Sequence, residues 1–209
     1  MKKTLYSILA VAMGAMSLSS CEDQLDIEQK GVTSIENFYK TDADAEAALA
    51  AAYEGFMCNV CGRQPDMGGP GIYTPFKIIM NMCGDDVLYA SGNYGDHEFS
   101  GMLNEFRYDA EAEVPKFFYS GLYLSIYTCN LVTDYFKDAD TPVKKRCVAE
   151  ARVLRAYDYF LLANLWGTPP FVDHVLPGDA LPYNCDKDPD NPMTHEELIL
   201  WVAKECEEA

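Results

Sequence analysis

Apolar residues recur at helical spacing along several stretches of the chain, and residues that begin or end helices bound each of them. The clearest stretch is 141–172. Pro142 suits the first position of a helix because its missing N–H costs nothing there, and Thr141 is the expected N-cap. Gly167, followed at once by two prolines, ends the helix. This stretch therefore predicts a helix over 142–166.

The apolar positions of the 142–166 helix fall on two faces. One line holds Cys147, Ala151, Leu154, Leu161 and Leu165, and the other holds Val153, Ala156, Phe160 and Ala163. A helix that is apolar on two faces packs between other helices, as in a bundle or a solenoid.

The preceding stretch, 115–136, predicts a second long helix that begins at Pro115. Phe117, Leu124, Tyr127 and Leu131 line one face, while Phe118, Leu122, Cys129 and Phe136 line others. The short Lys-Asp-Ala-Asp loop between the two helices predicts an antiparallel hairpin.

Two further helices are expected, one near each end of the region. An alanine-rich stripe over 45–56 follows Thr41, and a capping box at Thr194 and Glu197 opens a last helix. Glycine and proline mark 62–75, 84–99 and 173–193 as loops. The fold class predicted is all-α, with helical hairpins and long loops.

The sequence of the 142–166 helix resembles that of the SusD/RagB family. The resemblance rests on Glu150-Ala-Arg152, Leu154-Arg155-Ala156-Tyr157, Tyr159-Phe160 and Leu165-Trp166-Gly167-x-Pro169-Pro170, together with Phe38–Ala43 and the Gly84-Asp85 pair. It implies hairpins of tetratricopeptide type, an assignment that the periodicity alone does not make. It also implies a lipid-anchored, glycan-binding partner of a SusC-like TonB-dependent transporter in the outer membrane.

Residues 1–20 read as a lipoprotein signal peptide, with a basic start and an apolar segment too short to span a bilayer. Leu18-Ser-Ser-Cys21 resembles a lipobox, so Cys21 is the expected site of acylation (palmitate or a similar chain), and 21–32 is the expected tether. The alternative is an ordinary signal peptide with a chance cysteine. Glu22 and Asp23 resemble an acidic surface-export signal.

The remaining 33–209 would then be a SusD-like N-terminal helical domain. Family members continue well past this point, and the last helix ends at Ala209 with no evident packing partner. We therefore expect the domain to be incomplete at its C-terminus and weakly stable alone.

Composition narrows the possible functions. Of the 209 residues, 49% are hydrophobic, which suits a folded domain, and the net charge of −17 disfavours nucleic acid as a partner. No nucleophile elbow, phosphate loop or paired catalytic carboxylates stand out, so the chain is not expected to be an enzyme. Cys58 and Cys61 have redox-pair spacing, but buried thiols or an incidental disulfide are the favoured interpretation.

One pattern suggests a metal, and no other cofactor is expected. Asp186, Asp188 and Asp190, with Glu197, are spaced like ligands of an EF-hand-type calcium loop. No helix precedes them and two prolines stiffen the segment, which favours the alternative of a solvated acidic loop followed by a capping glutamate.

The glycan site is expected in the loop after Gly84-Asp85, because the resemblance places it there. Tyr89, Asn93, Tyr94 and His97 offer aromatic faces for the C–H sides of sugars and polar groups for their hydroxyls. The alternative is that the two tyrosines only pack the loop against the helices.

The resemblance thus implies capture of an oligosaccharide at the cell surface and its delivery to the transporter. Two other functions stay open: a lipid-anchored helical scaffold that binds only protein, and a truncated remnant that binds nothing.

Overall fold

The computed structural model describes residues 35, 37–61, 79–81, 83–84, 98–109 and 113–209. Phe38–Ala209 is a compact unit distinct from Met1–Asn37. The helices with their bounds are α2 (Asp42–Cys61), α4 (Glu98–Asn104), α5 (Glu113–Tyr135), α6 (Pro142–Trp166), the short 3-10 helix η3 (Cys185–Lys187) and α7 (His195–Glu208). Within these ranges there is no β-strand, only a bridge between Pro170 and Asn184. The all-α prediction is confirmed.

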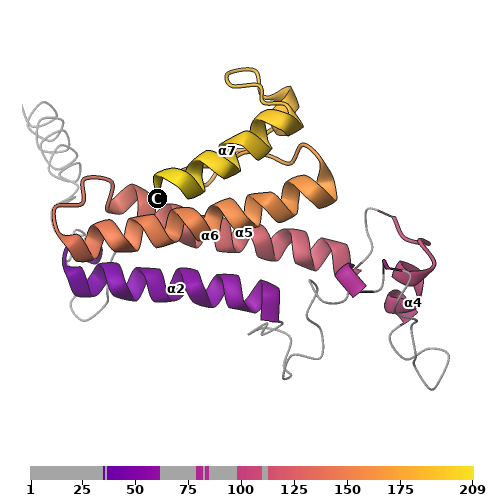
Figure 1. Ribbon diagram of the computed structural model, residues 1–209, viewed down its shortest axis with the longest axis horizontal. Helices are drawn as coiled ribbons and strands as arrows, with labels where there is room; N and C mark the ends of the chain where they lie inside the picture. Colours follow the sequence, from indigo (N-terminus) through magenta and orange to yellow (C-terminus); the bar gives the residue numbers. More distant parts are fainter. Residues whose placement is uncertain (1–34, 36, 62–78, 82, 85–97, 110–112) are drawn as a thin grey trace, which may run out of the picture. The chain divides into compact units, whose positions relative to one another are not determined.

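The helices pack as a hairpin with one further helix on each side. α5 and α6 pack along each other, α2 contacts both of them, and α7 contacts α6 (Figure 1). The start of α7 meets the end of α6, where His195 Nδ1 lies 3.0 Å from the Gly167 carbonyl oxygen. The end of α7 reaches back to Arg152 near the middle of α6, so α7 is antiparallel to it. The predicted antiparallel hairpin of 115–136 and 142–166 is confirmed.

Two clusters of buried side chains hold these helices together. The first joins α5, α6 and α7 through residues such as Phe118, Leu122, Tyr159, Leu162 and Leu198. The second joins α2, α5 and α6 through residues such as Leu49, Ala52, Val132, Phe136 and Leu154. The small residues of α2 let it come close to α5: a Cβ on Gly55 would lie 3.2 Å from Thr128 Oγ1.

The predicted helix ends are confirmed by their capping bonds. Thr141 caps α6 by accepting the Lys144 N–H at 3.2 Å, and its hydroxyl donates to Asp42 Oδ1 of α2 at 2.6 Å. Gly167 ends α6 with a φ of 75°, which favours glycine, while its N–H donates to the Ala163 carbonyl at 2.9 Å. The capping box of Thr194 and Glu197 opens α7.

The two-faced burial predicted for α6 is only half right. Leu154 is buried, as are Ala156 and Ala163, but Val153 and Phe160 of the second line are 42% and 44% exposed. The position of α7 explains this difference. α7 covers the side of α6 that carries Tyr159, whereas the side that carries Val153 and Phe160 faces outward.

Of the apolar faces predicted for α5, one is partly exposed. Leu124 and Tyr127 are 61% and 46% exposed, whereas Phe118, Leu122 and Cys129 are fully buried. Both faces of α5 are rich in apolar residues, so periodicity alone did not distinguish the side that meets α2 and α6.

Three smaller differences concern the loops and the last helix. α4 begins at Glu98, inside a stretch predicted as loop, and η3 forms a turn within 173–193. The last helix does have a packing partner, because Leu198 and Val202 are buried in the cluster with α6. A missing packing partner of the last helix is therefore not a reason to expect weak stability.

Candidate functional site

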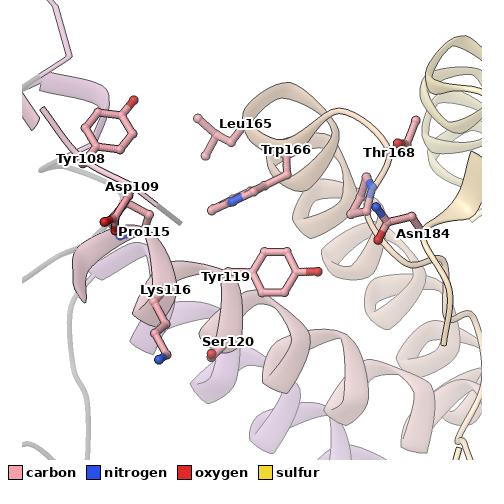
Figure 2. A pocket seen from close by; sticks show the side chains of 11 residues that line it. Tyr108, Asp109, Pro115, Lys116, Tyr119, Ser120, Leu165, Trp166, Thr168 and Asn184 are labelled. Atoms are coloured by element: carbon pink, nitrogen blue, oxygen red, sulfur yellow. The ribbon is translucent and has the colours of Figure 1, made fainter. Parts of the chain in front are cut away.

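An open pocket lies where the first turns of α5 meet the end of α6. Its volume is ≈ 730 Å³, a size usual for small-molecule sites. Figure 2 shows Trp166 and Tyr119 projecting into it, with Tyr108 and Asp109 on one side and Thr168 and Asn184 on the other. The complete lining is Tyr108, Asp109, Pro115, Lys116, Tyr119, Ser120, Leu165, Trp166, Thr168, Pro169 and Asn184.

Aromatic rings form one side of this pocket. The rings of Tyr119 and Trp166 meet edge to face, with centroids 5.2 Å apart and planes at 70°. Phe118 is fully buried and packs against Trp166 from the core, with ring centroids 6.1 Å apart. Because the indole is held by rings from α5, it presents a fixed apolar surface; we call Tyr119 and Trp166 the ring wall.

Polar groups surround the ring wall. Asp109, Lys116 and Ser120 lie on the α5 side, and Thr168 and Asn184 lie on the side of the α6 exit. This set holds one acid and one base with hydroxyl and amide groups, which both donate and accept hydrogen bonds. Aromatic faces beside such groups suit a ligand that has C–H faces and hydroxyl edges.

The other side of the pocket is fixed by the way α6 ends. After Gly167, the Pro169 carbonyl accepts the Cys185 N–H at 3.1 Å, and Pro170 forms the bridge with Asn184. Cys185 itself is buried. Thr168, Pro169 and Asn184 are thus held on paired backbone segments, and we call them the loop wall.

The arginines of the family-like motif on α6 serve a structural role outside the pocket. Arg155 is only 5% exposed. Its Nη1 donates to Asn130 Oδ1 at 2.8 Å and to the Asp173 carbonyl at 2.6 Å. Its Nη2 donates to Glu205 Oε2 at 3.0 Å. Arg152 donates to both oxygens of the same Glu205. Burial alone would raise the pKa of Glu205, but the hydrogen bonds from both arginines outweigh it and leave that pKa lowered. The pair therefore joins α5, the α6 exit and α7.

A second polar group of α6 is buried without such partners. Asp158 is fully buried, and neither carboxylate oxygen receives a hydrogen bond of good geometry from the described part of the chain. Burial raises its pKa to about 8, and the nearby Ser125 hydroxyl offsets only part of that rise. Asp158 is therefore mostly protonated at pH 7.

The site predicted from the sequence falls elsewhere in the chain. Tyr89, Asn93, Tyr94 and His97 lie outside the described residues, as does Cys21, so these predictions stay untested. No described helix has the length and apolarity needed to cross a bilayer.

The acidic residues with EF-hand-type spacing, for which the solvated loop is the favoured interpretation, do not form a ligand cluster in the described part of the chain. No three His, Cys, Asp or Glu side chains converge as metal ligands within the described ranges, which include 186–197. Asp188 instead accepts the backbone N–H groups of Asp190 and Asn191, and Glu197 is taken up in the capping box of α7. Asp186 is exposed. The spacing resembled an EF-hand loop because turn and cap residues are the same oxygen-bearing residues.

Sequence reasoning missed the pocket because its residues come from four separate segments. In the sequence Trp166 stands out only as part of a motif, and nothing near Tyr119 shows which way its ring points. One signal was available: a tryptophan directly before a helix-ending glycine and two prolines stands at a fixed corner of the chain.

The comparisons with known proteins agree with one another. Residues 85–197 match the SusD-like_3 family model, described as "Starch-binding associating with outer membrane". The chain is 26% identical over 184 residues to SusD-like protein P25 of Formosa agariphila, covering 82% of this chain and 32% of that protein. A solved SusD superfamily protein of Bacteroides vulgatus ATCC 8482 matches with a TM-score of 0.60 at 14% identity, covering 80% of this chain and 34% of that one. This chain thus spans about a third of the length of either relative.

Proposed function

Because the chain belongs to the SusD-like family of starch-binding proteins that associate with the outer membrane, we propose that it binds glycan at the cell surface and passes it to a SusC-like TonB-dependent transporter. The role is binding and not catalysis. The relatives are about three times as long, so this proposal concerns the part that the present residues play in capture.

The observation that carries the proposal is the pocket between the ring wall and the loop wall. An indole held against a second ring offers the apolar platform that the C–H face of a sugar needs. The carboxylate, ammonium, hydroxyl and amide groups around it can bond sugar hydroxyls. Both walls belong to packed helices or paired segments, which reduces the cost of ordering them on binding.

The test is a glycan array followed by calorimetry with the glycan that binds. We expect Trp166→Ala to abolish binding, while the control Phe160→Ala, which removes a 44%-exposed ring from the same helix outside the pocket, leaves affinity unchanged. Equal binding by both variants would move the site away from the pocket. Tyr89→Ala and Tyr94→Ala test the loop site: lost binding with an unchanged thermal melt would place the sugar there.

The membrane attachment is a proposal of its own, resting on the lipobox-like sequence before Cys21. We expect Cys21→Ala to shift the protein from the membrane fraction to the soluble fraction. Unchanged sedimentation with membranes would show that another anchor holds it.

A second candidate function is a lipid-anchored scaffold that binds only protein. The outward face of α6 favours it, because Val153, Tyr157 and Phe160 expose about two-fifths of their surface each. The two functions differ in one result: co-purification of a SusC-like transporter by a chain that binds no arrayed glycan supports the scaffold alone.

A further inference from the structure

Tyr123 lies next to the pocket without being part of its lining: it contacts Tyr119 of the ring wall and Pro170, the residue that follows Pro169 of the loop wall. Its hydroxyl donates to the Pro170 carbonyl oxygen at 2.6 Å. Its ring lies 4.9 Å from the ring of Tyr119, one turn earlier on α5. Burial raises the pKa of this phenol well above its usual value, so the hydroxyl keeps the proton that it donates.

The Pro170 carbonyl, which accepts the Tyr123 hydroxyl, lies where the two backbone segments that carry the loop wall are paired. Pro170 forms the bridge to Asn184, and the carbonyl of the residue before it accepts the Cys185 N–H at 3.1 Å. Moving Pro170 would therefore move Pro169 and Asn184 together, and both line the pocket.

No described group replaces the Tyr123 hydroxyl at equal strength. The Tyr159 hydroxyl lies 3.5 Å from the same carbonyl oxygen, a distance too long for a strong bond. That hydroxyl is also occupied by Val172, whose N–H it accepts at 2.6 Å and whose carbonyl lies 3.1 Å away. Without the Tyr123 hydroxyl, Pro170 would keep only the longer contact.

The ring wall depends on Tyr123 in the same way. Tyr119 packs between Tyr123 and Trp166, with centroid distances of 4.9 Å and 5.2 Å. One side chain thus connects the ring on which a ligand would stack to the backbone that carries the facing polar groups.

We propose that Tyr123 is the positioning residue of the pocket: it sets the separation of the ring wall and the loop wall, and through them the affinity for a glycan. The affinity part rests on the proposed function. The geometric part does not, because it concerns how firmly Trp166 and Pro170 are placed in the free protein.

The perturbation is Tyr123→Phe, which keeps the ring against Tyr119 and removes the hydroxyl. The matched control is Tyr127→Phe, one turn later on the same helix, where the side chain is 46% exposed and outside the pocket. Maltoheptaose, a soluble starch oligosaccharide, is the probe for calorimetry. Acrylamide quenching of Trp166 fluorescence needs no ligand; the chain has two tryptophans, so it is measured in a Trp201→Phe background.

We expect Tyr123→Phe to raise the Kd by up to about tenfold, because the worth of the lost hydrogen bond, ~1.4 kcal/mol, is the most that the binding free energy can lose. We also expect increased quenching of Trp166, with both changes absent in Tyr127→Phe. The melting temperature of Tyr123→Phe should fall by only about 2–4 °C, as the loss of one hydrogen bond implies. Unchanged quenching in Tyr123→Phe overturns the positioning role. A variant that fails to fold also overturns it, since the hydroxyl would then serve the fold as a whole. Parent protein that binds no glycan refutes the proposed function, while the quenching result still decides whether Tyr123 positions Trp166.

Discussion

Replacing Asp158 by asparagine should change how stability depends on pH. Asp158 is fully buried and its pKa is raised to about 8, against about 3.9 for an aspartate in water. Between these values the folded state holds a proton that the unfolded chain has released. The free energy of unfolding therefore falls as pH rises through this window, and the fall ends at about pH 8.

The magnitude follows from the width of the window. Each pH unit within it costs about 1.4 kcal/mol, so the loss at pH 7 is on the order of 4 kcal/mol relative to acid conditions. Asparagine has the same shape and never ionises, so Asp158→Asn should be free of this loss. Cys129 lies beside Asp158, but burial raises the pKa of its thiol too, so it stays neutral and adds no slope.

The assay is urea unfolding followed by circular dichroism, on parent and variant, at several values between about pH 5 and about pH 9. The measured quantity is the difference between the two free energies of unfolding at each pH, which cancels every group the two chains share. We expect this difference to grow in favour of Asp158→Asn by about 1.4 kcal/mol per unit up to about pH 8, and then to level off.

The matched control is Asp140→Asn, which removes the same charge from the surface. Its carboxylate pairs with Lys144 at 2.8 Å, and the hydrogen bond from that lysine lowers its pKa, so its difference from the parent should be flat over the same range. A flat difference for Asp158→Asn as well would mean that Asp158 is ionised in the folded protein, with a partner or water that the buried geometry does not suggest.

Five other substitutions test the helix packing, the buried ion pair and a helix cap. Leu154→Ala should lower the free energy of unfolding by about 2–5 kcal/mol because Leu154 is only 7% exposed. Phe160→Ala should lower it by about 1 kcal/mol or less because Phe160 is 44% exposed. Equal losses in urea unfolding would contradict the assigned α6 faces. Arg155→Met should lower the free energy of unfolding by about 3 kcal/mol in the same assay, because it removes a donor from the Asp173 carbonyl and from Glu205. An unchanged urea midpoint would show that the Arg155–Glu205 pair does not stabilise the fold. Thr141→Ala should cost about 1 kcal/mol through the lost N-cap and Thr141→Ser should restore most of it in a thermal melt; no rescue by serine would assign the effect to the methyl group.

Helix ends were predictable because their signals are local. Thr141, Pro142 and Gly167 lie at the ends of the helix that they bound, and Thr194 lies three residues from its partner in the capping box. Each acts through backbone groups only a few residues away, so no knowledge of the rest of the fold is needed.

Helix faces and the pocket were not predictable in the same way. α6 carries apolar residues on more than one face, and whether Phe160 is buried depends on where α7 lies. The pocket needs Tyr108, Tyr119, Trp166 and Asn184 to meet from four segments. Such meetings are set by packing between distant elements, which periodicity does not encode.

The segment after the loop wall has a further consequence for how this domain can vary. At one end the Val175 N–H donates to Asp134 and the His174 carbonyl accepts from Asn130; at the other, Asn184 is bridged to Pro170. Residues 177–179 and 181–182 between these two points are exposed. Lengthening a loop costs little once both of its ends are fixed, roughly 0.6 kcal/mol for each doubling. An inserted peptide at 177–182 would therefore leave the backbone at Asn184 in place while bringing new side chains to the neighbourhood of the pocket, which makes this stretch the natural point at which to graft a different ligand preference onto the same helices.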